Sequence, residues 1–252
     1  MDVIPNEEEQ MVKNLAREFL EAECPPSLAR NMEKDDLGYP PDLWKKMADL
    51  GWLGMALPEE YGGQGLSPTY LGLIMEEIGR SIAPVPALST VVPAGTIAQH
   101  GTEQQRANTL PRVSQGDLVL TWAIQEADPR LLPENIHLAA TSESDNFILN
   151  GTKMFVGNFV CADQVLVAAR TAPESDLNKG ISLFLVDTHS TGISSTSLTT
   201  LAKDKQSKVY FDQVHGAIHK PNWGSESRLG NRPRNVRPCD RPNLRTDGRS
   251  NS

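Results

Sequence analysis

The chain has 252 residues, a formal net charge of −8 at neutral pH and three cysteines. Its length allows one or two domains, and its acidic balance argues against nucleic acid as a partner. The cysteines are widely spaced and include no C-x-x-C pair, so we expect neither a disulfide framework nor a zinc site. Because no secretory signal and no apolar run of about 18 residues is found, we expect a cytoplasmic protein without a membrane span.

The first 116 residues show the apolar spacing of helices. Asn6 and Glu9 have the pattern of a capping box. The stripe that follows, which we expect to face the core, consists of Met11, Val12, Leu15, Ala16, Phe19 and Leu20. The prolines at 25 and 26 should end this first helix. Further helices are expected from 41 to about 50, from 67 to about 82, from 87 to about 100 and from 102 to about 116.

From Asp117 the pattern changes to short runs rich in β-branched and aromatic residues. Turn-forming residues separate these runs, which is typical of a small antiparallel barrel or sandwich. The expected strands cover residues 118–124, 136–141, 147–156, 165–169, 181–186 and 209–211. Helices first and strands afterwards predict an α+β chain, with a helical domain at 1–116 and a β domain at 117–214.

Residues 215–252 have a different character. Eight lysines or arginines stand there against three acidic residues, and large apolar residues are few. Such a segment cannot bury enough surface to offset its ordering entropy, so we expect a disordered basic tail. One interpretation is an arm for an acidic partner. The other is a segment foreign to the fold, such as an out-of-frame gene end, because the pattern changes abruptly.

The usual catalytic motifs are missing. No G-x-G-x-x-G, P-loop or G-x-S-x-G sequence occurs. His215 and His219 are four residues apart, but no helix is expected there, so we predict no metal site. Three other stretches are informative because of their order along the chain. They are the glycine-rich residues 51–66, the strand and polar turn at 120–129, and the turn and strand at 149–158.

In this order the stretches resemble the acyl-CoA dehydrogenase family over roughly residues 5–214. Pro58-Glu59-Glu60-Tyr61-Gly62-Gly63 resembles the family's signature between two main helices. Ala123-Ile124-Gln125-Glu126 stands where the family has its first flavin segment, and Asn150-Gly151-Thr152-Lys153-Met154-Phe155 stands where it has its second. Leu183-Phe184-Leu185-Val186 and Val209-Tyr210-Phe211-Asp212-Gln213-Val214 continue the middle domain in family order.

The resemblance implies a fold of three parts: a helical domain, a β-barrel domain and a C-terminal four-helix bundle. It implies an FAD-dependent enzyme that desaturates an acyl-CoA thioester at the α,β bond and passes electrons to an electron-transfer flavoprotein. Family members are usually homo-oligomers. The catalytic base is usually a glutamate of the bundle, which this sequence does not match, so no catalytic residue is assigned. We therefore expect little or no dehydrogenase activity from this chain, and homo-oligomerisation is doubtful for it.

Five residues are carried over as candidate FAD contacts. Trp122, Ile124 and Gln125 match the first flavin segment, where backbone amides bond the pyrimidine edge of the ring. Phe155 and Gly157 match the second segment, which lies behind the isoalloxazine. The alternative interpretation is that the aromatic residues at 122 and 155 only pack the barrel.

Several positions depart from the family pattern. Gln125 replaces a common threonine, Ala127 a proline, Phe155 a tryptophan and Gly157 a hydroxyl residue, while Leu131 falls near the place of a serine that commonly contacts ligand. Backbone contacts to a flavin are compatible with these changes, whereas hydroxyl contacts are not. The alternative function is therefore a non-catalytic paralogue that binds acyl-CoA or flavin, or an interaction module.

Overall fold

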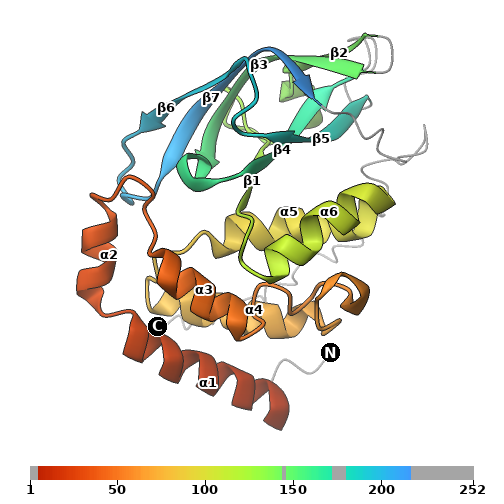
Figure 1. Ribbon diagram of the computed structural model, residues 1–252. Coiled ribbons are helices and arrows are strands. Elements are labelled where there is room, and N and C mark those ends of the chain that lie inside the picture. Colours follow the sequence, from red (N-terminus) through yellow and green to blue (C-terminus); the bar gives the residue numbers. More distant parts are fainter. Residues whose placement is uncertain (1–4, 144–145, 172–179, 217–252) are drawn as a thin grey trace, which may run out of the picture.

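The computed structural model describes residues 5–143, 146–171 and 180–216. Figure 1 shows the helices gathered below a curled sheet, with α5 and α6 between the sheet and the other helices. This arrangement confirms the predicted α+β class. The elements in chain order are α1 (Glu7–Glu23), α2 (Pro26–Met32), α3 (Pro41–Asp49), η1 (Glu59–Tyr61), α4 (Pro68–Arg80), α5 (Ala87–His100), α6 (Glu103–Ser114), β1 (Leu120–Ala123), η2 (Pro133–Asn135), β2 (Ala139–Glu143), β3 (Asn146–Gly157), η3 (Phe159–Cys161), β4 (Gln164–Arg170), β5 (Ile181–Asp187), β6 (Ile193–Leu198) and β7 (Gln206–Gly216).

Local sequence signals set the helix ends. The Asn6 side chain accepts from the Glu9 backbone amide at 2.9 Å, and the Glu9 carboxylate accepts from the Asn6 amide at 2.9 Å, which confirms the capping box. Helix α1 ends before the two prolines as predicted. The second of them, Pro26, then occupies the first position of α2, a helix that the sequence pattern did not predict.

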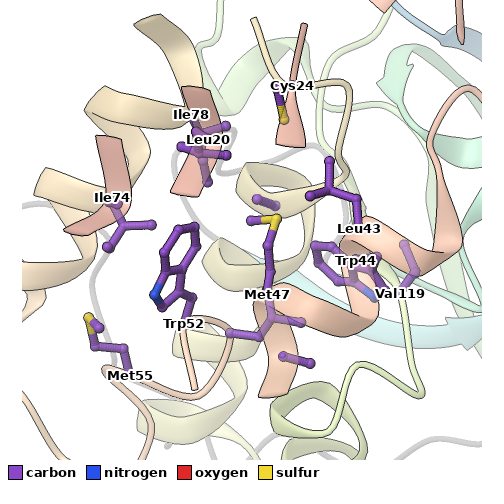
Figure 2. Close-up of a cluster of buried hydrophobic side chains, with 14 of the residues drawn as sticks. Leu20, Cys24, Leu43, Trp44, Met47, Trp52, Met55, Ile74, Ile78 and Val119 are labelled. Atoms are coloured by element: carbon purple, nitrogen blue, oxygen red, sulfur yellow. The ribbon is translucent and has the colours of Figure 1, made fainter. Parts of the chain in front are cut away.

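The core of the helical region lies between α1, α3 and α4. Figure 2 shows Trp52 and Met47 at its centre, close to Leu20, Ile74 and Ile78. Leu20, Met47 and Ile74 are completely buried. The predicted stripe on α1 is wider than the face that packs here. Met11 and Leu15 are 62% and 58% exposed and do not belong to the core, contrary to expectation.

A buried carboxylate joins α1 to α4. Glu77 has no exposed side-chain surface, and its two oxygens accept from Arg17 Nη2 at 2.8 Å and from Arg80 Nε at 2.7 Å. The hydrogen bond from Arg17, with that from Arg80, lowers the pKa of Glu77 to about 2, although desolvation opposes the shift. Both arginines are more than 40% exposed, so each keeps contact with water.

The strands form one mixed sheet that curls into a half-barrel. The order is β1-β4-β2-β3-β7-β6, and β5 pairs with the other side of β4. The pairing of β1 and β2 with β4 is parallel and the remaining pairs are antiparallel. Strand β6 was not predicted. The Asn150-Gly151 pair, which was expected to form a turn before a strand, lies inside β3. Beside it β7 carries an extra residue, so the register between the two strands shifts.

Helix α5 fixes the start of β1 and the end of β3. The Thr90 hydroxyl oxygen accepts from the Leu120 amide at 3.2 Å and donates to the Leu120 carbonyl at 3.3 Å. The Asn158 side-chain amide donates to Ser89 Oγ at 3.0 Å. Because these bonds hold both strands to one helix, the residues at their ends have a defined position relative to each other.

Two predictions concern the edges of the described structure. Strand β7 continues to Gly216, two residues beyond the expected end of the β domain at 214. The rest of the expected basic tail, including His219, lies outside the described residues.

Among the helices that are described, none combines the length and the hydropathy that crossing a membrane requires.

Candidate functional site

The two segments predicted to contact flavin lie side by side. The Thr121 hydroxyl donates to the Gly157 carbonyl at 2.6 Å, and the Met154 amide donates to the Gln125 carbonyl at 2.8 Å. These bonds connect β1, and the turn that follows it, to the last residues of β3. Sequence positions that are about 30 apart therefore form one continuous surface.

The five predicted residues are not equally accessible. Ile124 is 40% exposed and Phe155 is 51% exposed, so both present apolar surface to solvent. Trp122, Gln125 and Gly157 are partly buried. The structure thus brings all five together, and it places two large apolar side chains on the outside of the site, beside the backbone of the turn.

Phe155 has an unusual backbone conformation. Its φ is 53°, in the left-handed region that large side chains rarely adopt. The reason is a bulge: the register between β3 and β7 shifts between Lys153 and Val156. A bulge redirects the side chain that follows it, and bulges are common beside active sites. Here Val156 is completely buried, while the ring at 155 is turned outward.

A buried ion pair lies directly beneath this surface. Lys153 is completely buried, and its ammonium donates to Glu126 Oε1 at 2.8 Å and to the Ile124 carbonyl at 3.0 Å. The Glu126 carboxylate also accepts from the backbone amides of His137, at 3.0 Å, and Leu138, at 2.9 Å. Burial lowers the pKa of Lys153, and Glu126 partly opposes this shift.

Sequence reasoning assigned no role to this pair, although a signal was present. Leu149 and Lys153 are four residues apart on one strand, so side-chain alternation puts them on the same face. Leu149 is completely buried. A lysine on the core-facing side of a strand needs a buried partner, because an isolated buried charge is very costly. The nearby Glu126 is the acidic residue that fills this need.

The turn after β1 carries further exposed apolar groups. Arg130 donates to Asp128 at 2.6 Å, and this bond lowers the pKa of Asp128 to about 2. The turn then presents Leu131, which is 70% exposed, and Leu132, which is 40% exposed. The position that the family resemblance compared with a ligand-contacting serine is therefore an exposed leucine.

The chemistry of the surface suits a flat ring with an apolar body and a polar edge. Ile124 and Phe155 offer apolar contacts, and the amides of the turn offer hydrogen-bond donors next to them. Within the described ranges, no group of histidine, cysteine or carboxylate side chains is placed to hold a metal ion.

Comparison with known proteins agrees with this arrangement. Residues 6–117 match the model of the acyl-CoA dehydrogenase N-terminal domain, and residues 129–214 match the model of its middle domain. The chain belongs to the acyl-CoA dehydrogenase family. It spans about half the length of the curated relatives it matches.

Individual relatives come from several bacteria. The acyl-CoA dehydrogenase FadE26 of Mycobacterium tuberculosis is 35% identical over 172 residues, which cover 67% of this chain and 43% of the relative. Among solved structures, an acyl-CoA dehydrogenase from Geobacillus kaustophilus is 28% identical with a TM-score of 0.74, over 86% of this chain and 58% of that one. A glutaryl-CoA dehydrogenase from Mycobacterium smegmatis in complex with FADH2 is 26% identical with a TM-score of 0.72, over 84% of this chain and 54% of that one.

Proposed function

We propose that this chain supplies the FAD-binding face of an acyl-CoA dehydrogenase, with Trp122, Ile124, Gln125, Phe155 and Gly157 as its flavin contacts. The observation that carries the proposal is the junction of β1 and β3. There an exposed isoleucine and an exposed phenylalanine flank a turn whose carbonyls are already bonded. The solved complex of the Mycobacterium smegmatis glutaryl-CoA dehydrogenase with FADH2 supports the assignment.

The residues present fit the isoalloxazine ring. Phe155 offers an aromatic surface for the apolar part of the ring, and Ile124 offers an aliphatic one. The backbone amides of Gln125 and Glu126 would donate to the polar edge. When bound, FAD supplies the hydride-accepting chemistry. The chain's own residues hold the ring in place and exclude water from one of its faces.

The carboxylate that lies in the junction itself is not free to act as a base. Glu126 is the acidic residue closest to the junction, and its oxygens are already engaged by Lys153 and two backbone amides. A proton-abstracting base must lie within hydrogen-bond reach of its substrate. We therefore propose that the complete reaction, desaturation of an acyl-CoA thioester with an electron-transfer flavoprotein as acceptor, needs a glutamate from outside the described residues.

The test is to purify the full chain, titrate it with FAD and follow the quenching of flavin fluorescence. The proposal expects saturable binding and a perturbed flavin absorption band. It also expects that an added acyl-CoA leaves the flavin oxidised, because this chain has no assigned base. A chain that binds acyl-CoA but not FAD would contradict the proposal and support the alternative of a flavin-free binding paralogue.

A further inference from the structure

Two peptide groups in the turn after β1 are held by their carbonyls. The Ile124 carbonyl accepts from the Lys153 ammonium at 3.0 Å, and the Gln125 carbonyl accepts from the Met154 amide at 2.8 Å. The described residues contain no cis peptide bond. In a planar trans peptide the N–H points opposite to the carbonyl. The Gln125 N–H is therefore directed away from Lys153, and the Glu126 N–H away from Met154.

These two N–H groups are left as donors. No hydrogen-bond acceptor for either of them is found in the described parts of the chain. Backbone donors are nearly always paired in folded proteins, with protein, water or ligand. Two adjacent amides with fixed directions, next to the exposed side chains of Ile124 and Phe155, are therefore available to a ligand.

We propose that Lys153 is a positioning residue that sets the direction of these two donors toward the flavin. The inference rests on the proposed function, since it names the group that orients the same site. Lys153 contributes in two ways. It holds the Ile124 carbonyl directly, and it holds Glu126, whose carboxylate is also bonded to the amides of His137 and Leu138. The turn is thereby attached to β3 on one side and to the start of β2 on the other.

Burial explains why the arrangement is rigid. The lysine side chain is completely buried and the Glu126 side chain is only 10% exposed. Water therefore competes little for these hydrogen bonds, and bonds between charged groups are stronger than neutral ones. Loss of the ammonium would release the first peptide group and leave a carboxylate without its cation.

The experiment uses the full chain, with Lys153→Met and the double variant Lys153→Met/Glu126→Gln. The double variant removes both charges, so it avoids an unpaired buried carboxylate. The control is Glu77→Gln, which disturbs a buried carboxylate between α1 and α4, away from the turn. Near-ultraviolet circular dichroism checks that each variant is folded.

The first readout needs no FAD. Amide hydrogen exchange is measured at Met154, His137 and Leu138, whose N–H groups bond the turn. We expect about tenfold faster exchange at Met154 in Lys153→Met. In the Glu77→Gln control, which lowers the global stability, any acceleration is shared by all three amides. Unchanged exchange at all three amides in a folded Lys153→Met protein would overturn the positioning role.

The second readout is the dissociation constant for FAD. We expect it to rise about tenfold in Lys153→Met, the size of one lost charge-assisted hydrogen bond, and to stay raised in the double variant. If the double variant returns to wild-type affinity, Lys153 only neutralises Glu126 and the inference is wrong. If the wild-type chain binds no FAD, the proposed function fails and the flavin role of Lys153 with it, while the exchange rates still decide whether Lys153 holds the turn.

Discussion

A substitution at Phe155 tests whether its ring contacts flavin or only packs the barrel. The residue suits this test because its backbone is strained and its ring is half-exposed. The perturbation is Phe155→Gly. A large residue in the left-handed region costs about 1–2 kcal/mol, and glycine removes this cost. The ring is 51% exposed, so its burial stabilises the fold by about half of a full phenylalanine, or about 1 kcal/mol. The two effects nearly cancel, and the free energy of unfolding should change by less than about 1 kcal/mol.

The matched control is the next residue. Val156 is completely buried, and Val156→Ala should lower the free energy of unfolding by about 2 kcal/mol. Thermal and urea unfolding, followed by circular dichroism, measure both variants. FAD affinity should show the reverse order: a loss of about tenfold for Phe155→Gly, from the missing aromatic contact, and little change for Val156→Ala. If Phe155→Gly is as unstable as Val156→Ala and binds FAD like the wild type, the ring is barrel packing and the reasoning is refuted.

Three further predictions concern stability. Glu77→Gln should lower the free energy of unfolding by about 2 kcal/mol at pH 7. The pKa of folded Glu77 is about 2 against an ordinary 4.5, so its contribution is complete above pH 4.5 and lost as the pH falls toward 2. In urea unfolding, the free energies of unfolding of the mutant and the wild type should become equal as the pH approaches 2. A difference that stays constant with pH would contradict this pH dependence. Gly63→Ala should lower the free energy of unfolding by about 3 kcal/mol, because its Cβ would lie 2.1 Å from the Leu57 carbonyl oxygen. An unchanged midpoint of urea unfolding would contradict this and show that the loop adapts. Gly157→Ser should lower the free energy of unfolding by less than about 1 kcal/mol, since its Cβ meets only the Gln206 side chain, at 3.6 Å. A large fall in melting temperature would contradict this prediction.

Local signals predicted much of the helical region. The capping box at Asn6 and the prolines that begin α3 and α4 act within one turn of helix, so a short stretch of sequence contains them completely. The extent of the core did not follow from the same pattern. Met11 and Leu15 share helical spacing with the buried residues of α1, but only the arrangement of α4 decides which side of that stripe is covered.

Contacts between residues far apart in sequence determine more of the β region and of the candidate site than of the helical region, so less of them could be predicted. Strand β6 is mostly polar, and its pairing with β7 defines it as a strand. The candidate flavin contacts could be named by motif order, but the outward position of Phe155 depends on a bulge against β7. The Lys153–Glu126 pair joins residues 27 apart in sequence, and alternation along β3 indicates that the lysine is inward without identifying its partner.

The claim that the junction of β1 and β3 binds FAD is tested most directly by amide chemical shifts. The full chain, labelled with nitrogen-15, is titrated with FAD and each backbone amide is followed. We predict that the signals of Gln125, Glu126 and Phe155 shift together and saturate, whereas that of Ile74 in the α1–α4 core does not move. Saturable shifts confined to the helical core, or no shifts at residues 122–126 and 153–157, would contradict the account.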